Sequence, residues 1–143
     1  MPLHKPAYAA KIRYKKAVGI TDISTNSEGF VDMTNMSLTV TTGTNPMLIS
    51  ANLPIIFAQI AYLAQVRLVI DDVEEEIAQI APLEHYPYWS NAYTFTWLKV
   101  LTTGVHTIKI QWRTEDNLYY IYQKGATYPR QLTILELDGA IEL

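Results

Sequence analysis

The chain has 143 residues, of which 49% are hydrophobic and 17% charged, and its formal net charge at pH 7 is −3. Ten tyrosines, three tryptophans and three phenylalanines are available for burial, so the composition excludes a disordered chain and fits one domain with a packed core. The absence of cysteine excludes a disulfide scaffold, a thiolate metal site and a cysteine nucleophile.

The first sixteen residues include five basic side chains and no acidic one, and the first acidic residue is Asp22. Residues 17–143 contain six basic side chains against fourteen acidic ones. We therefore predict an extended N-terminal arm over residues 1–16 and a domain over residues 17–143. The arm is expected either to contact an acidic partner or to be a solvated tail. Its candidate partner-binding residues are Lys5, Lys11, Arg13, Lys15 and Lys16.

Neither nucleic acid nor a membrane is an expected partner. The acidic domain would repel phosphate, which argues against nucleic-acid binding as the main function. The longest apolar stretch, 53–66, is interrupted by Pro54, Gln59 and Gln65 and falls short of the roughly 18 residues that a membrane span requires. The N-terminal residues do not resemble a signal peptide, so we expect a soluble chain without a targeting segment.

From residue 18 onward the hydrophobic pattern has a period of two, which is typical of an all-β domain. About nine strands are predicted, enough for two packed sheets. Residues 55–65 are interpreted as strand or loop, although Ile56, Ile60 and Leu63 would also fit a helical spacing. The predicted strands are Gly19–Ser24, Ser37–Thr42, Met47–Leu53, Val66–Ile70, Val73–Ile77, Tyr93–Leu98, Val105–Thr114, Leu118–Gln123 and Gln131–Leu137.

Two of these strand pairs are predicted to be hairpins. One joins Val66–Ile70 to Val73–Ile77 through Asp71-Asp72, whose short side chains suit a turn. The other joins Tyr93–Leu98 to Val105–Thr114 through residues 101–104, where Gly104 is free to take a positive φ. The acidic run that follows Ile70 lacks the residue order of an EF-hand, so a solvated turn and an acidic edge strand are expected.

The strand Gln131–Leu137 carries apolar side chains on both faces. Leu132 and Ile134 lie on one face, whereas Leu135 and Leu137 lie on the other. Such a strand is expected to be central in its sheet or to lie at a contact between subunits.

Few residues suggest chemistry. The three histidines, His4, His85 and His106, have no metal-site spacing, so no metal or other cofactor is expected. His106 falls on the apolar face of its strand and is interpreted as a hydrogen-bonded structural residue. No nucleophile or phosphate-loop motif occurs, and we expect no enzyme and no catalytic residue.

The irregular segment 82–90 has two prolines and three aromatic residues. It is interpreted either as a packed loop or as a recognition loop. Its candidate ligand-binding residues are His85, Tyr86, Tyr88 and Trp89.

Five segments within residues 37–137 together resemble a known family. The most specific part is 104–113, which lies within the fourth segment. The five segments are Ser37–Gly43, Pro46–Ala51, Val66–Val73, Leu101–Arg113 and Arg130–Leu137. This series resembles the small jelly-roll modules of tailed bacteriophages, which are similar in architecture to trimeric tumour necrosis factor-like domains. The resemblance implies a two-sheet jelly-roll β-sandwich preceded by the extended arm.

The same resemblance implies a homotrimer that is made in the host cytoplasm and incorporated into the virion. Its expected partner is the major capsid protein or another virion protein, and its expected role is that of a capsid decoration or cement protein. The alternative is a receptor- or carbohydrate-binding module of a phage tail. The strands carry more aromatic surface than one sandwich must bury, which predicts a trimer interface; the alternative is a larger core within one chain. The residues predicted for it are Tyr93, Phe95, Trp97, Tyr120 and Tyr122.

Overall fold

A computed structural model describes residues 13–57, 63–80, 90–118 and 120–137. These residues form ten β-strands and no helix. The strands are β1 (Arg13–Gly19), β2 (Asp22–Thr25), β3 (Val31–Thr42), β4 (Pro46–Phe57), β5 (Ala64–Ile70), β6 (Val73–Ile80), β7 (Ser90–Val100), β8 (Gly104–Thr114), β9 (Ile121–Lys124) and β10 (Arg130–Glu136).

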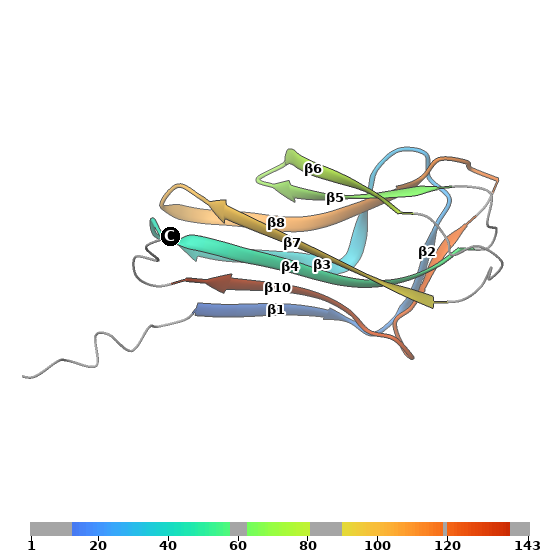
Figure 1. Ribbon diagram of the computed structural model, residues 1–143, viewed down its shortest axis with the longest axis horizontal. Helices are drawn as coiled ribbons and strands as arrows, with labels where there is room; N and C mark the ends of the chain where they lie inside the picture. The colour runs from blue at the N-terminus through green and yellow to red at the C-terminus, as the bar shows by residue number, and fades with distance from the viewer. Residues whose placement is uncertain (1–12, 58–62, 81–89, 119, 138–143) are drawn as a thin grey trace, which may run out of the picture.

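The strands form two antiparallel sheets packed face to face (Figure 1). The β8 sheet has the order β3-β8-β5-β6. In the β4 sheet, β7 pairs along one edge of β4, whereas β10 and then β9 pair along the other edge. Strands β1 and β2 lie outside β10 and β9, so that β1-β10-β4-β7 forms the second layer. This arrangement is a jelly roll, which confirms the predicted fold class.

Alternating side chains fill the space between the sheets. In β8, His106, Ile108, Ile110 and Trp112 are all less than 9% exposed, whereas the intervening residues face solvent, as predicted. In β10, Leu132 and Ile134 are buried in the same core. Since β10 lies between β1 and β4, the prediction that this strand is central in its sheet is confirmed.

The β5–β6 hairpin is confirmed. Asp71 and Asp72 both have positive φ, 52° and 62°, which is the backbone of a two-residue turn whose twist matches that of the flanking strands. As expected, β6 is an edge strand, with Glu74 exposed and Glu75 half-buried.

The second predicted hairpin is wrong. Strand β7 pairs with β4, whereas β8 pairs with β3 and β5, so residues 101–103 cross from one sheet to the other. Leu101 packs against the core along this crossing. A period of two is the same for a hairpin and for a connection between sheets, so the local pattern did not separate them.

The predicted boundary between arm and domain also changes. All seven residues of β1 pair with β10, so residues 13–16 belong to the sheet rather than to the arm. The predicted strand Gly19–Ser24 divides between the end of β1 and β2. Of the ambiguous segment 55–65, residues 55–57 complete β4 and Ala64 begins β5, whereas 58–62 lie outside the described residues.

A buried arginine links the two sheets where β9 ends and β10 begins. The Arg130 guanidinium is fully buried and donates through Nε to the Thr34 carbonyl of β3 (2.8 Å) and through Nη1 to the Thr21 carbonyl (2.7 Å). Thr34 lies in a bulge of β3, where Asn35 has a positive φ. Burial lowers the pKa of Arg130, and the negative charge of Asp22 opposes this effect.

Two glycines leave the space that this guanidinium occupies. A Cβ atom at Gly19 would overlap Arg130 Cζ and Nε. A Cβ atom at Gly125 would overlap the Thr21 carbonyl and would lie 2.8 Å from Arg130 Nη1. Glycine is therefore required at both positions, because atoms of Arg130 or Thr21 occupy the space that a Cβ atom would need.

We expect Gly19→Ala and Gly125→Ala to lower the free energy of unfolding by about 1–3 kcal/mol each, because the added methyl group displaces a fixed guanidinium or backbone carbonyl. Urea denaturation followed by circular dichroism measures this change. Gly43→Ala is the matched control, since nothing lies within 4 Å of its Cβ position. Equal stabilities of all three variants would contradict this account of Arg130.

Candidate interaction surfaces

The structure separates the predicted basic arm residues. Lys15 and Lys16 are exposed on opposite faces of β1, and Arg13 pairs in register with Glu136 of β10. Lys5 and Lys11 lie outside the described residues. The part of this cluster that the structure describes is therefore Arg13, Lys15 and Lys16, all on the edge strand β1.

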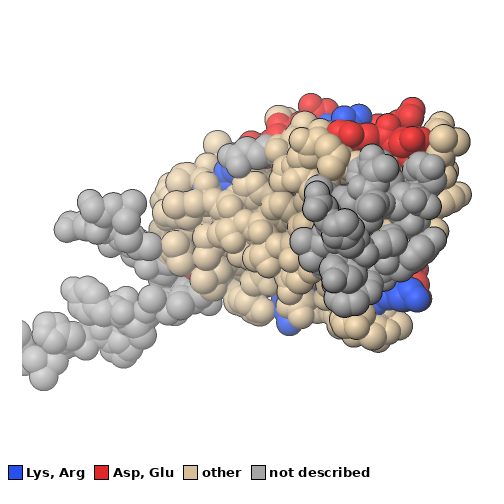
Figure 2. Space-filling view, turned by 45° about the vertical axis from the view of Figure 1, so that its right-hand side comes forward, with Lys and Arg blue, Asp and Glu red and all other residues tan. Residues whose placement is uncertain are grey.

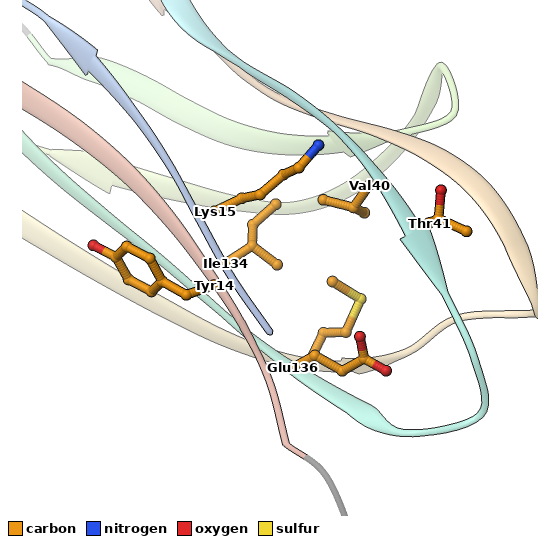
Figure 3. Close-up of a pocket in the computed structure, with 7 residues that line it drawn as sticks. Tyr14, Lys15, Val40, Thr41, Ile134 and Glu136 are labelled. Carbon is orange, nitrogen blue, oxygen red and sulfur yellow. The ribbon is translucent and has the colours of Figure 1, made fainter. Parts of the chain in front are cut away.

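A pocket of about 260 Å³ opens between the edge strands β1 and β3 (Figure 3). Its floor is formed by Val40, Met47 and Ile134, which belong to the core. Lys15 lies across one side of the pocket and donates to the Thr39 carbonyl (2.6 Å). Glu136 lies at the other side, almost buried, and accepts a hydrogen bond from Asn45 (3.3 Å). This arrangement suits the burial of a small apolar group, and the described residues that line it include no nucleophile hydrogen-bonded to a base.

His106 connects three segments at one end of the β8 sheet. Its Nδ1 lies 2.5 Å from Asp71 Oδ2 in the β5–β6 turn, and its Nε2 lies 2.6 Å from the Thr102 carbonyl. The hydroxyl of Thr42, at the end of β3, donates to the same carbonyl (2.8 Å). Asp71 Oδ1 also accepts the backbone N–H of Thr107 (2.8 Å).

This geometry favours a structural role for His106. A catalytic histidine paired with an aspartate presents its second ring nitrogen to a nucleophile, but here that nitrogen faces a backbone carbonyl. Both neighbours of the ring are acceptors, and a histidine donates from both nitrogens when it is protonated. The Thr102 carbonyl and then Asp71 raise the pKa of His106, while the hydrogen bonds from His106 and Thr107 lower the pKa of Asp71.

The residues predicted for a trimer interface lie in two different environments. Tyr93, Phe95 and Trp97 are on the core side of β7, where Trp97 is 6% exposed and stacks with Phe95 at 5.9 Å between ring centres. Tyr120 is exposed and Tyr122 half-buried, with their rings 6.0 Å apart. Trp97 is thus largely covered by its own chain, and the interface assignment stays a prediction.

The candidate ligand loop, with His85, Tyr86, Tyr88 and Trp89, lies outside the described residues. Among the side chains that are described, no three histidine, aspartate or glutamate residues converge on a point where they could hold a metal ion. Nor does this part of the chain contain a helix of the length and hydropathy that crossing a membrane requires.

The outer face of the β8 sheet carries charged side chains that are joined by hydrogen bonds and ion pairs. Arg67 of β5 donates to Gln111 of β8 (2.8 Å) and pairs with Glu74 (3.1 Å). Its guanidinium lies 4.0 Å from the centre of the Phe30 ring, and that of Arg113 lies 5.1 Å from it.

Acidic groups continue along this side of the molecule. Lys109 bridges Asp32 (3.2 Å) and Asp72 (3.6 Å). A hydrogen bond from Gln111 lowers the pKa of Asp32, and Lys109 adds to this effect. Figure 2 shows acidic side chains along the upper margin of the molecule, where β5 and β6 lie in Figure 1.

The outer face of the β4 sheet is different, and the sequence analysis did not identify it as a candidate site. Four apolar side chains from four strands form one row across it, because successive pairs are in register: Tyr14 with Leu135, Leu135 with Leu48, and Leu48 with Leu98. Tyr14 and Leu98 are 57% and 58% exposed. The signal in the sequence was the second apolar face of Gln131–Leu137, which includes Leu135.

Comparisons with known proteins agree with the topology. No family model matches the chain, and a search of curated proteins gives no match. Among solved structures, the VP2 subviral particle of infectious bursal disease virus matches 91% of this chain with a TM-score of 0.53 at 13% identity. The T=1 particles derived from the same virus match 91% with a TM-score of 0.54 at 12% identity.

The similarity is one of fold. This chain spans 38% and 37% of the two viral chains, and identities this low show that the jelly-roll architecture is shared and no more.

We expect the contribution of His106 to stability to depend on pH. Because its folded-state pKa is raised, its stabilising effect is complete below its ordinary pKa of about 6.5 and is lost as pH rises through the raised value. The pKa of Asp71 is lowered, so its effect is present above about pH 3.9 and is lost as pH falls through the lowered value. The difference in stability between the natural chain and His106→Gln should be largest between these limits.

Thermal unfolding across pH measures this difference, and nuclear magnetic resonance titration of the His106 ring gives its pKa directly. In Asp71→Asn the His106 pKa should fall, because one charged acceptor is removed. A pKa at or below 6.5 in the natural chain would contradict the double-acceptor geometry.

Proposed function

We propose that this chain is a non-enzymatic structural protein of a virus particle, and more specifically a trimeric capsid decoration or cement protein of a tailed phage. The observation that carries the proposal is the jelly-roll sandwich of β1-β10-β4-β7 over β3-β8-β5-β6, which is similar in fold to the VP2 subviral particle of infectious bursal disease virus across 91% of the chain. Jelly rolls of this kind recur in capsid and lectin domains.

The distribution of polar groups supports a structural role. His106 and Asp71, which would be the first candidates for acid–base chemistry, are held by Thr102 and Thr107 at one end of a sheet. Arg130 is likewise used to join two sheets. These ionisable groups therefore stabilise the sandwich.

In the proposed mechanism, the protein is made in the host cytoplasm and then incorporated into the virion. There it binds the major capsid protein or another virion protein through many equivalent, individually weak contacts. On a symmetric shell, each additional contact of the same assembled molecule forms at high effective concentration, so modest affinities add to a stable coat. The basic residues before β1 are proposed to contact acidic groups of the shell, which makes this contact sensitive to salt.

The test is co-sedimentation with empty shells of the phage that encodes the chain. Residues 1–12 should be deleted rather than 1–16, because residues 13–16 pair with β10 and their removal would damage the sheet. We expect the natural chain to bind shells saturably, and the deletion to weaken binding at least about tenfold at low ionic strength.

Lys124→Ala is the matched control, since it removes one exposed positive charge from the domain. Failure to bind shells would contradict the proposal. Binding to glycans or cells that is lost in Tyr88→Ala or Trp89→Ala would instead favour the alternative, a receptor- or carbohydrate-binding module.

A further inference from the structure

The outward positions of the three strands β10, β4 and β7 carry no charged side chain over residues 131–135, 46–52 and 92–100. We call this surface the neutral face. Its members are Gln131, Thr133, Leu135, Pro46, Leu48, Ser50, Asn52, Ala92, Thr94, Thr96, Leu98 and Val100.

Two rows of the neutral face are apolar. Leu135, Leu48 and Leu98 form the first row, and Tyr14 of β1 extends it at the sheet edge. Pro46 and Val100 are paired in the adjacent row, and Val100 is 68% exposed. The remaining positions are threonine, serine, asparagine, glutamine and alanine, which are compatible with desolvation when their polar groups are paired.

The size of this surface fits a contact between proteins. Residues 131–135, 46–52 and 92–100 of the neutral face and residues 14–18 of β1 beside it number 26, and at about 3.3 Å per residue and about 4.8 Å between strands they cover on the order of 400 Å² in projection. A stable interface buries about 800 Å² of accessible surface per partner, and side chains make accessible area larger than projected area. Interface cores are also depleted of charged residues relative to the rest of the surface.

The distribution of charged side chains favours a second copy of this chain as the partner that covers the neutral face. Membrane surfaces and nucleic acids attract clusters of basic side chains; the neutral face itself carries none, and Lys16 of β1, in register with Thr133, lies at its edge. Two copies of this chain, each with a net charge of −3, would repel if their acidic groups met. Asp32, Asp72 and Glu74 lie with the opposite sheet, so copies that meet through their neutral faces keep these carboxylates apart.

We propose that the neutral face is the surface through which copies of this chain associate, with Tyr14, Leu48, Leu98, Val100 and Leu135 at its apolar centre. The occupant is a second copy of the chain. The proposal deepens the trimer of the proposed function by assigning its contact surface, in place of the core-side Tyr93, Phe95 and Trp97.

The test uses light scattering coupled to size-exclusion chromatography on the full chain. In the double variant Leu98→Lys and Val100→Lys, two charges enter the neutral face at positions that are already solvent-exposed, so the fold of one copy is preserved. The control is Ile77→Lys and Val105→Lys, which makes the same kind of change at side chains 52% and 66% exposed on the β8 sheet. Circular dichroism should show the same strand content in both.

We expect the natural chain and the control to have an assembled mass, about three times 16.3 kDa for the trimer. The neutral-face variant should have the mass of one chain, with its apparent dissociation constant raised at least about 100-fold. Dissociation of the control to the same extent, or an unchanged mass of the neutral-face variant, would overturn the proposal.

A natural chain that is monomeric at all accessible concentrations would also overturn it. Shell binding is measured separately and distinguishes the two proposals. Shell binding by a monomeric chain would leave the structural role standing without this interface. Assembly through the neutral face without shell binding would leave the interface standing without the proposed function.

Discussion

The pairing of β4 on both of its edges is the constraint on which the β4 sheet depends. Eleven consecutive residues of β4, Pro46–Ile56, pair with β7, and the opposite edge pairs first with β10 and then with β9. The strands β1 and β2 are placed through β10 and β9 in turn. Because each register step of one residue reverses the faces of a strand, this chain of pairings decides which side chains reach the core and which form the outer surface.

Two polar clusters fix segments that strand pairing does not join, one between the sheets at Arg130 and one at an end of the β8 sheet at His106. Arg130 fills the break between β9 and β10 and reaches the bulge of β3 in the other sheet. His106 connects the β5–β6 turn to the start of β8 and to the connection from β7. Each places ionisable groups against backbone carbonyls, so these groups contribute to the architecture rather than to a reactive site.

The two outer faces then differ in the chemistry that they offer. On the β8 sheet, Arg67, Arg113 and Lys109 bind carboxylates, amides and the Phe30 ring, which suits contact with water or with a polar partner. On the β4 sheet, the apolar side chains of Tyr14, Leu135, Leu48 and Leu98 are aligned across four strands. The proposed assembly requires one surface that meets other copies and another that remains outside, and the proposal assigns these to the β4 and β8 sheets.

The sequence by itself predicted strands within β2 to β10, the inward face of β8 and the Asp71-Asp72 turn, because alternation and turn chemistry are local properties of neighbouring residues. It missed β1, because residues 13–16 were assigned to the arm. It did not determine that β7 joins β4 rather than β8, that Arg130 is buried between Gly19 and Gly125, or that Tyr14, Leu135, Leu48 and Leu98 share one row. Tertiary structure decided these features, because each depends on the partner and register of strands far apart in the chain. Period-two patterning carries no information about partner or register.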